Sequence, residues 1–234
     1  MFKYFGSKLN LTTAYPPPVF DTVIEPFAGS AAYAVAHRHV DRVVLVERDA
    51  AVVALWRRLL AMTADQIRQL PDPVAGTTSS DLLVAFASGR TTRDTPPTFI
   101  VSPRMAQRFR PMVNRIASVV DECRHFEVVE GDYTDAPDVQ ATWFIDPPYA
   151  PTPGGRWDRA RGGRYRHNNA SLDYADLATW CTSRSGQVIV CEQDGSDWLP
   201  WNGQVSARDG AHGGYQEVWW TNMPDPRPRQ QSLL

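Results

Sequence analysis

The fold is decided by residues 22–62, which run TVIEPFAGSAAYAVAHRHVDRVVLVERDAAVVALWRRLLAM. The apolar run Thr22–Phe27 predicts a short buried strand that turns into an alanine-rich helix ending near His39. A second strand is predicted over Arg42–Glu47, and apolar residues at helical spacing predict a helix over Ala50–Met62. Strand, helix, strand and helix in about 40 residues form a βαβ unit, so we expect an α/β fold with a Rossmann-like parallel sheet.

The alternation of strands and helices breaks between residues 63 and 125, where prolines interrupt short helical stretches. We predict a small, mainly helical inserted subdomain here, with its clearest helix over Met105–Val120. Strands resume at Phe126–Glu130 and Ala141–Ile145. Further elements are predicted as a helix over Leu172–Thr182, a strand over Gln187–Cys191 and a late antiparallel strand over Gln216–Thr221. Residues 1–62 and 126–222 would then form the main domain, and residues 223–234 a flexible tail.

Composition indicates a folded protein with a substantial core. Of the 234 residues, 43% are hydrophobic and 21% are charged, which is too little charge for a disordered chain. No apolar run is long enough for a membrane helix, and residues 1–8 lack the apolar region of a signal peptide, so we expect neither membrane attachment nor export. The three cysteines are widely spaced, and His37 and His39 point in different directions on their helix, so we expect no metal site.

The net charge of −2 conceals two basic segments. Residues 90–115 contain six arginines and one aspartate, and residues 156–166 contain five arginines and one aspartate. The rest of the chain is acidic. A run of arginines is often only a solvated face, but two runs in an otherwise acidic chain favour contacts to phosphates, which supply most of the non-specific affinity for nucleic acid.

The turn after the first strand, Ala28-Gly29-Ser30, is a candidate binding site. Glycine lets a backbone approach a ligand, and the following helix offers N–H groups. Glu47 ends the second strand 18 residues later, and acids at about that distance bind ribose hydroxyls in nucleoside-binding α/β folds; Asp49 is a competing candidate. Only one of the three glycines of the dinucleotide motif is present, which disfavours a nicotinamide-dependent enzyme.

The second candidate site is Asp146-Pro147-Pro148-Tyr149, directly after the apolar strand that ends at Ile145. The two prolines end the strand and stiffen the turn at the edge of the sheet where α/β folds bind ligands. Asp146 and the Pro147 carbonyl can accept hydrogen bonds from an exocyclic amino group, and the ring of Tyr149 can stack on a flat base. These four residues suit a base that carries an amino group.

Five short motifs occur in an order that resembles the Dam-type DNA adenine-N6 methyltransferases. They are Phe2–Lys8, Glu25–Ser30, Val46–Asp49, Gly131-Asp132-Tyr133 and Asp146–Tyr149, with the insert preceding the last. The resemblance covers most of the chain. Two residues depart from the family pattern: Ala31 stands where a second glycine is usual, and Glu47 replaces the commoner aspartate.

The resemblance implies that S-adenosylmethionine is the methyl donor and double-stranded DNA the partner of a cytoplasmic bacterial or phage enzyme. It implies donor contacts at Tyr4, Lys8, Phe27, Gly29, Glu47 and Asp132. The target adenine, flipped out of the duplex, would be held by Asp146, Pro147, Pro148 and Tyr149. We expect DNA contacts at Arg104, Arg108, Arg110 and Arg115 in the insert and at Arg161 and Arg164 in the loop after Tyr149. No metal is implied, and nothing in the sequence indicates an oligomeric state.

Three alternatives remain open from the sequence. The same chemistry could act on cytosine N4 or on a base in RNA. The chain could also be a relative that binds DNA without catalysis, for which Ala31 leaves some room, although the intact Asp146–Tyr149 motif argues against it.

Overall fold

The computed structural model describes residues 1–2, 8, 11–90, 92, 95–151, 172–209 and 213–227. At 207–209 and 213–215 only the backbone is considered. Within these ranges no helix is long and apolar enough to cross a membrane.

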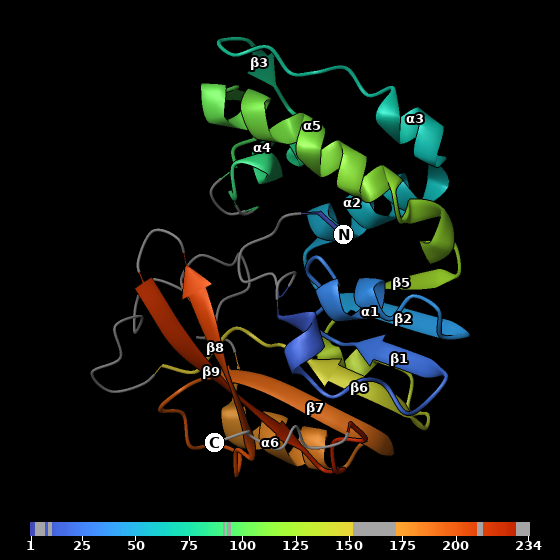
Figure 1. The fold of residues 1–234 in the computed structure, drawn as a ribbon, viewed down its shortest axis with the longest axis vertical. Helices are drawn as coiled ribbons and strands as arrows, with labels where there is room; N and C mark the ends of the chain where they lie inside the picture. The colour runs from blue at the N-terminus through green and yellow to red at the C-terminus, as the bar shows by residue number, and fades with distance from the viewer. Residues whose placement is uncertain are drawn as a thin grey trace, which may run out of the picture.

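A seven-stranded sheet forms the centre of the molecule (Figure 1). Its strand order is β5-β2-β1-β6-β7-β9-β8, and its first five strands are parallel. Their bounds are β1 Thr22–Glu25, β2 Arg42–Glu47, β5 Phe126–Glu130, β6 Ala141–Ile145 and β7 Gly186–Gln193. The last two strands, β8 (Gly203–Asp209) and β9 (Gly213–Thr221), form a hairpin that joins the sheet through antiparallel pairing of β9 with β7. The expected α/β fold with a mostly parallel sheet is confirmed.

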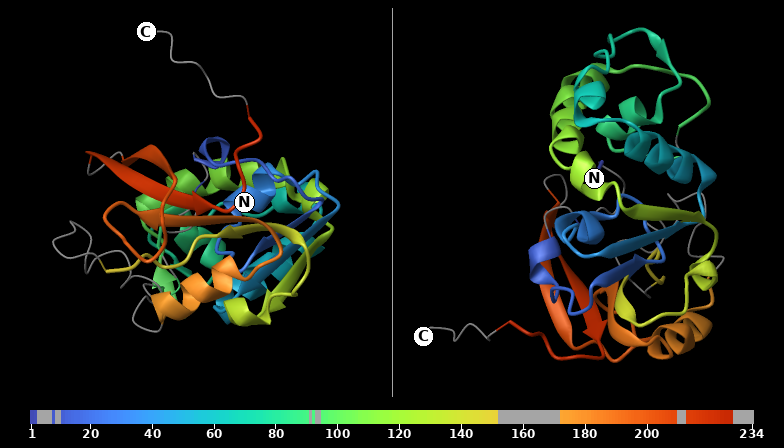
Figure 2. Two further views of the ribbon diagram at one scale, coloured as in Figure 1. Left: turned by 90° about the horizontal axis from the view of Figure 1, so that it is seen from below. Right: turned by 90° about the vertical axis from the view of Figure 1, so that its right-hand side faces the viewer.

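Helices cover both faces of the parallel strands (Figure 2). On one face lie α1 (Ala32–Ala36) and α2 (Ala50–Ala61), whose apolar side chains share a core cluster with Val43, Leu45 and Phe144. On the other face lies α6 (Tyr174–Thr182), which packs through Leu177 and Cys181 against a second cluster that includes Trp143 and Ile145. Two apolar faces explain why the central strands are continuous runs of buried residues.

The residues of 63–125 that the structure describes add no strand to the central sheet. They form α3 (Ala64–Arg68), α4 (Leu82–Ala87), α5 (Pro103–Ala117), the 3-10 turn η2 (Val120–Cys123) and a two-stranded ladder of β3 (Thr78–Ser79) and β4 (Phe99–Ile100). Figure 1 shows these elements gathered at one end of the molecule, beyond α2.

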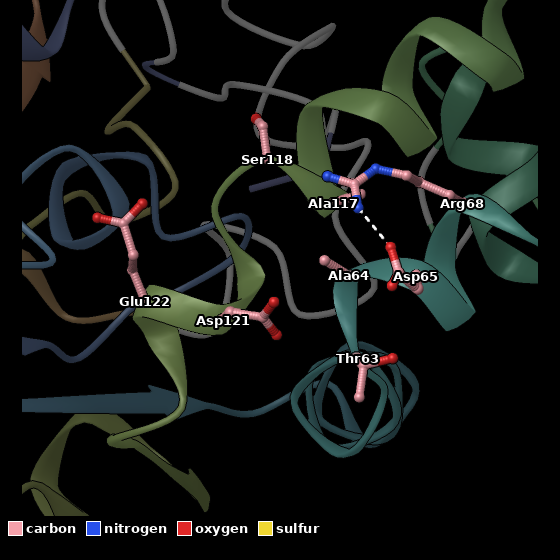
Figure 3. A pocket seen from close by; sticks show the side chains of 8 residues that line it. All are labelled: Thr63, Ala64, Asp65, Arg68, Ala117, Ser118, Asp121 and Glu122. Atoms are coloured by element: carbon pink, nitrogen blue, oxygen red, sulfur yellow. Dashed lines mark hydrogen bonds and ion pairs between the residues drawn. The ribbon is translucent and has the colours of Figure 1, made fainter.

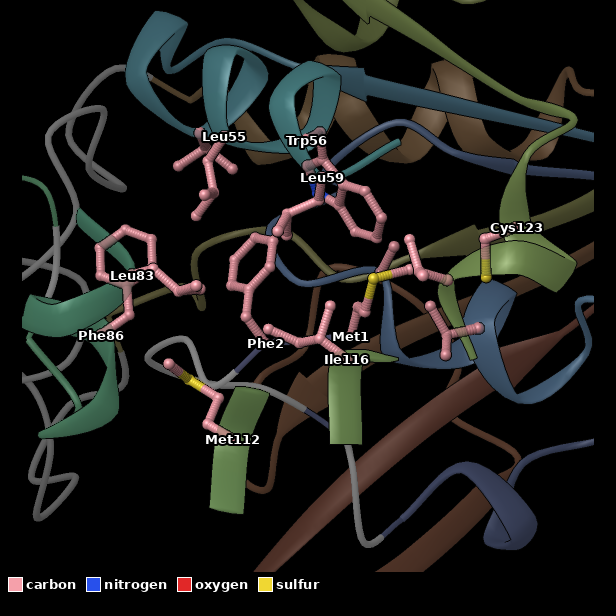
Figure 4. Close-up of a cluster of buried hydrophobic side chains, with 14 of the residues drawn as sticks. Met1, Phe2, Leu55, Trp56, Leu59, Leu83, Phe86, Met112, Ile116 and Cys123 are labelled. Atoms are coloured by element: carbon pink, nitrogen blue, oxygen red, sulfur yellow. The ribbon is translucent and has the colours of Figure 1, made fainter. Parts of the chain in front are cut away.

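The same residues share their core with the main sheet. Phe2 lies between the two parts, with its ring centroid 5.4 Å from that of Trp56 on α2 and 5.7 Å from that of Phe86 on α4 (Figure 4). Met112 and Ile116 of α5 belong to this cluster as well. The segment therefore packs on the sheet domain through a continuous apolar layer.

The helix predicted over Met105–Val120 is α5, which begins two residues earlier and ends at Ala117. Ser102 caps its first turn by accepting a hydrogen bond from Met105 N, and Pro103 occupies the first helical position, where no N–H is required. Pro111 lies on the exposed side, where the carbonyl left without a backbone N–H partner faces solvent. The apolar side of α5 is buried from Met105 to Ala117.

The sequence analysis did not predict β8, and its strand over Gln187–Cys191 is shorter than the observed β7. β8 contains alternating polar residues and no apolar run, so its pairing with β9 holds it in the sheet. The helix predicted to extend to His39 ends at Ala36. Arg227 lies in the stretch expected to be flexible, yet its guanidinium donates to the carbonyls of Thr13 and Ala14, which belong to the 3-10 turn η1 (Thr12–Ala14).

Candidate functional site

The candidate site lies where the strand order of the sheet reverses. From β1 the chain adds β2 and β5 on one side and then returns to place β6 on the other side of β1. Parallel strands end at the same edge, and open α/β sheets bind ligands at this reversal point, outside the carboxyl ends of the strands. Residues 25–29 follow β1 and residues 146–149 follow β6, so the two candidate motifs flank this point.

Asp146 forms an ion pair with Lys8 at the end of β6. The distance from Lys8 Nζ to Asp146 Oδ1 is 3.0 Å, and Lys8 Nζ also donates a hydrogen bond to the Tyr149 hydroxyl. The ammonium lies 4.7 Å from the centroid of the Tyr149 ring. The side chain of Lys8 is 4% exposed and that of Asp146 is 21% exposed, so Asp146 is the member of the pair that a ligand can reach.

Two residues that the sequence analysis missed complete this cluster. Glu217 on β9 lies 3.3 Å from Lys8 Nζ through Oε1, and its Oε2 accepts a hydrogen bond of 2.8 Å from the Tyr15 hydroxyl. Both residues are buried. The available signal was a glutamate directly before Val218, Trp219 and Trp220 in a predicted strand, because a buried charge requires a partner.

Burial and neighbouring charges set the pKa of Asp146. Burial raises this pKa to about 6, Lys8 opposes the rise, and the negative charge of Glu217 adds to it. The carboxyl is therefore ionised near neutral pH and available as a hydrogen-bond acceptor. Burial raises the pKa of Tyr149 well above its usual range, so its phenol stays protonated.

The turn at residues 146–150, which carries Asp146, is held by hydrogen bonds that involve α6 and the end of β7. The Tyr174 hydroxyl on α6 donates a hydrogen bond of 2.6 Å to the Pro148 carbonyl. Ala150 N donates one of 3.0 Å to Glu192 Oε2 at the end of β7, and Trp198 Nε1 donates to the same oxygen at 2.8 Å. Burial raises the pKa of Glu192 to about 7. These contacts fix the turn before any ligand arrives.

Glu47 links the ends of β2 and β1. Its Oε2 accepts from Gly29 N at 2.9 Å, and its Oε1 accepts from Asp49 N at 2.8 Å. Burial raises the pKa of Glu47 to about 7, although these two N–H groups oppose the rise. A carboxylate has about four acceptor positions, so Glu47 keeps the capacity to accept a hydroxyl in addition to these backbone N–H groups.

The competing acid, Asp49, has a structural role in α2. It is the N-cap residue, accepts from Ala51 N at 3.0 Å, and accepts a further hydrogen bond from the Thr92 hydroxyl. Its side chain is buried. Of the two acids, Glu47 is therefore the one with acceptor capacity at the strand edge.

Phe27 and Asp132 lie beside Glu47. Phe27 stacks on Tyr133, with centroids 5.5 Å apart and an interplanar angle of 23°. Asp132 caps the 3-10 turn η3 (Tyr133–Asp135) and forms an ion pair of 3.3 Å with Arg48. The structure thus brings Phe27, Gly29, Glu47 and Asp132 to the adjacent ends of β1, β2 and β5.

Three other expectations have different outcomes. The first turn of α1 is less open than expected, because Ala34 N donates to the buried carboxyl of Glu25 at 2.6 Å. Lys8, expected to contact the donor, lies against Asp146 and Tyr149 at the end of β6. Tyr4, Arg161 and Arg164 lie outside the residues that the structure describes.

The expected DNA-binding arginines of α5 divide into two kinds. Arg104, Arg108 and Arg115 are exposed on one stripe of the helix and form no ion pair with another described residue. Arg110 points elsewhere: it pairs with Asp72 at 2.7 Å and donates to the carbonyls of Arg68 and Leu70. Three of the four arginines are therefore available for phosphate contacts, and Arg110 ties α5 to the segment after α3.

A separate pocket of about 410 Å³ lies between α3, the end of α5 and η2 (Figure 3). Its carboxylates already have partners. Asp65 pairs with Arg68 at 2.7 Å, as Figure 3 shows, and Glu122 pairs with Arg38 at 3.0 Å. None of its lining residues belongs to the cluster around Asp146.

Comparisons with known proteins give no relative. No family model matches the chain, and a search of the curated proteins finds no significant match. Among the described residues, no group of three or more His, Cys, Asp and Glu side chains is arranged to hold a metal ion.

Proposed function

We propose that this chain is a DNA adenine-N6 methyltransferase that uses S-adenosylmethionine as methyl donor. One observation carries the proposal: the two sets of motif residues lie on either side of the reversal point of the sheet. One set, around Glu47 and Gly29, has the acceptors and aromatic surface that a nucleoside requires. The other set presents a partly exposed carboxylate, ionised near neutral pH, at the end of β6.

The donor residues fit a nucleoside with a ribose and a flat base. Glu47 keeps the capacity to accept a ribose hydroxyl, and the stacked pair of Phe27 and Tyr133 offers a half-buried aromatic surface beside it. When bound, S-adenosylmethionine would supply an electrophilic methyl group on a sulfonium.

Asp146 would act on the amino group of the base. The lone pair of adenine N6 is delocalised into the ring and is a poor nucleophile. A hydrogen bond from N6–H to Asp146, and a second to the Pro147 carbonyl, would favour a tetrahedral nitrogen whose lone pair can attack the methyl group. The N–C bond forms as the C–S bond breaks, and the donor leaves as a neutral thioether. The negative charge of Asp146 stabilises the positive charge that develops on N6, which then releases its extra proton to water.

The fixed turn would contribute through positioning. Tyr174, Glu192 and Trp198 hold residues 148–150 from α6 and β7, so Asp146 does not have to be ordered when the base arrives. Flipping the base out of the duplex costs a few kcal/mol, which stacking on Tyr149 and phosphate contacts along α5 would offset. The exposed stripe of Arg104, Arg108 and Arg115 suits those phosphate contacts.

The test is to incubate the purified protein with unmethylated genomic DNA and labelled S-adenosylmethionine, and to analyse the digested nucleosides by mass spectrometry. N6-methyladenine is the expected product, and Asp146→Asn should abolish it while donor binding persists. N4-methylcytosine would retain the mechanism and overturn the substrate. Donor binding with no modified base in DNA would direct the test to RNA. Absence of donor binding would favour a DNA-binding relative without catalysis.

A further inference from the structure

Four side chains form a continuous chain of contacts from the interior to the candidate site. The Tyr15 hydroxyl donates to Glu217, Glu217 contacts Lys8, and Lys8 contacts Asp146. Glu217 pairs in register with Gln193 at the carboxyl end of β7, so the antiparallel strand β9 delivers an acid to the edge where the parallel strands end. The chain of contacts thus connects three segments that are distant in sequence.

The ammonium of Lys8 lies between two carboxylates of different accessibility. Asp146 is 21% exposed and Glu217 is 1% exposed, and the distances from Lys8 Nζ to their oxygens are 3.0 and 3.3 Å. A substrate can therefore reach Asp146 but not Glu217. In this structure the Lys8 ammonium is paired with Oδ1 of Asp146, one of the two oxygens to which an incoming amino group can donate.

We propose that Glu217 is a positioning residue for methyl transfer: it anchors Lys8, so that Asp146 can exchange the ammonium for the amino group of the base while Lys8 keeps a partner in the interior. This inference rests on the proposed function. Loss of a counter-charge destabilises a buried ammonium. With Glu217 in place, the exchange leaves Lys8 paired.

The charge of the cluster leads to the same conclusion. Lys8, Asp146 and Glu217 together carry one negative charge when both carboxyls are ionised. The nitrogen becomes positive as the methyl group arrives, so this excess negative charge lies where the reaction needs it. Without the charge of Glu217, Lys8 would neutralise Asp146 and that advantage would be lost.

Other titratable groups also face Asp146, and Glu217→Gln leaves all of them in place. They are Tyr149 from its own turn, Tyr15 and Lys8 from the N-terminal segment, Glu25 from β1, and Cys191 and Glu192 from β7. The charge of Glu217 raises the pKa of Asp146, so neutralising Glu217 should lower it.

The first variant is Glu217→Gln, whose amide oxygen can still accept from Tyr15 but which carries no charge. We expect kcat for methyl transfer to fall by about 10- to 100-fold, a typical effect of losing one electrostatic contact, with KM for the donor unchanged. The acidic limb of the pH profile should move to lower pH. Glu217→Asp, which keeps the charge, should recover part of kcat.

The matched control is Glu127→Gln on the edge strand β5, where Glu127 is exposed and paired with Arg42. It makes the same chemical change far from the cluster and should leave both kcat and the pH profile unchanged. Tyr15→Phe removes only the hydrogen bond to Glu217 and should give a smaller loss of kcat. It replaces Glu217→Gln in the test if that variant fails to fold.

A second measurement is independent of activity. Carboxyl ¹³C NMR titration of the free protein, with the Asp146 signal assigned through Asp146→Asn, should show a lower midpoint for Asp146 in Glu217→Gln than in the wild type. An unchanged midpoint, or wild-type kcat in Glu217→Gln, overturns the proposal. If the midpoint moves but the wild type transfers no methyl group, the coupling of Glu217 to Asp146 holds and the proposed function fails.

Discussion

Glu47 and Gly29 are joined by a hydrogen bond of 2.9 Å, which fastens the end of β2 to the turn that follows β1. The same carboxylate holds Asp49 N at 2.8 Å. The Glu47 side chain therefore fixes the backbone at Gly29 and at Asp49, on the side of the candidate site proposed for the donor.

Replacing this carboxylate should weaken donor binding. Glu47→Ala leaves two backbone N–H groups without their acceptor, which costs about 1–3 kcal/mol for each that stays buried. We expect the Kd for S-adenosylmethionine, measured by isothermal titration calorimetry, to rise at least tenfold, since 1.4 kcal/mol is a factor of ten. Glu130→Ala, at the exposed end of the neighbouring strand β5, is the control and should bind normally. Equal affinity for S-adenosylmethionine in the two variants would show that Glu47 does not contribute to donor binding.

Ala31 adopts the left-handed conformation that glycine favours, with φ of 46°, and is buried at the start of α1. The conformation costs an L-residue about 1–2 kcal/mol, whereas loss of the methyl group removes about 0.8 kcal/mol of burial. Ala31→Gly should therefore change the free energy of unfolding by no more than about 1 kcal/mol. Ala31→Val should lower it by more than about 2 kcal/mol, because a β-branched residue there is both strained and overpacked. Urea unfolding of both variants checks this, and a stable Ala31→Val protein would contradict it.

The arginine stripe of α5 should govern the salt dependence of DNA binding. Replacing Arg104, Arg108 and Arg115 by Gln should weaken binding to a labelled duplex in fluorescence anisotropy. Each lost phosphate contact should flatten the slope of log K against log salt by about 0.9. Arg110→Gln is the control on the same helix: it should lower stability through loss of its contacts with Asp72, Arg68 and Leu70, and leave the salt slope unchanged. A triple variant with the wild-type slope would exclude α5 from the DNA interface.

Glu25 should make stability depend on pH. Burial raises its pKa in the folded protein to about 8, from 4.5. The stabilising contribution of this group is thus complete below pH 4.5 and is lost as the pH rises through 8. Glu25→Gln cannot ionise and keeps an oxygen for Ala34 N. Denaturant unfolding at pH 5 and pH 8 measures the free energy of unfolding of both proteins. The value for the variant minus that for the wild type should be larger at pH 8 than at pH 5. An equal difference at the two pH values would contradict the raised pKa of Glu25.

The local sequence was sufficient for most of the sheet. Strands such as β2 and β6 are short continuous apolar runs, and such runs are typical of strands buried on both faces. The sequence was insufficient for β8, whose polar pattern gives no signal and whose position comes from pairing with β9. It also placed the end of α1 too late.

By itself, the sequence determined which side chains stand at the strand ends. Asp146 stands between an apolar strand and two prolines, and Glu47 ends another strand, so their positions at the edge follow from local geometry. Only the tertiary structure decided their partners. Lys8 meets Asp146 and Glu217 because β9 pairs antiparallel with β7 and brings its acid to the same edge, and Arg110 differs from Arg108 because Asp72 lies on its side of α5. The contacts of Lys8 join residues far apart in the chain, and they form because a buried charge must find a partner wherever the fold places one.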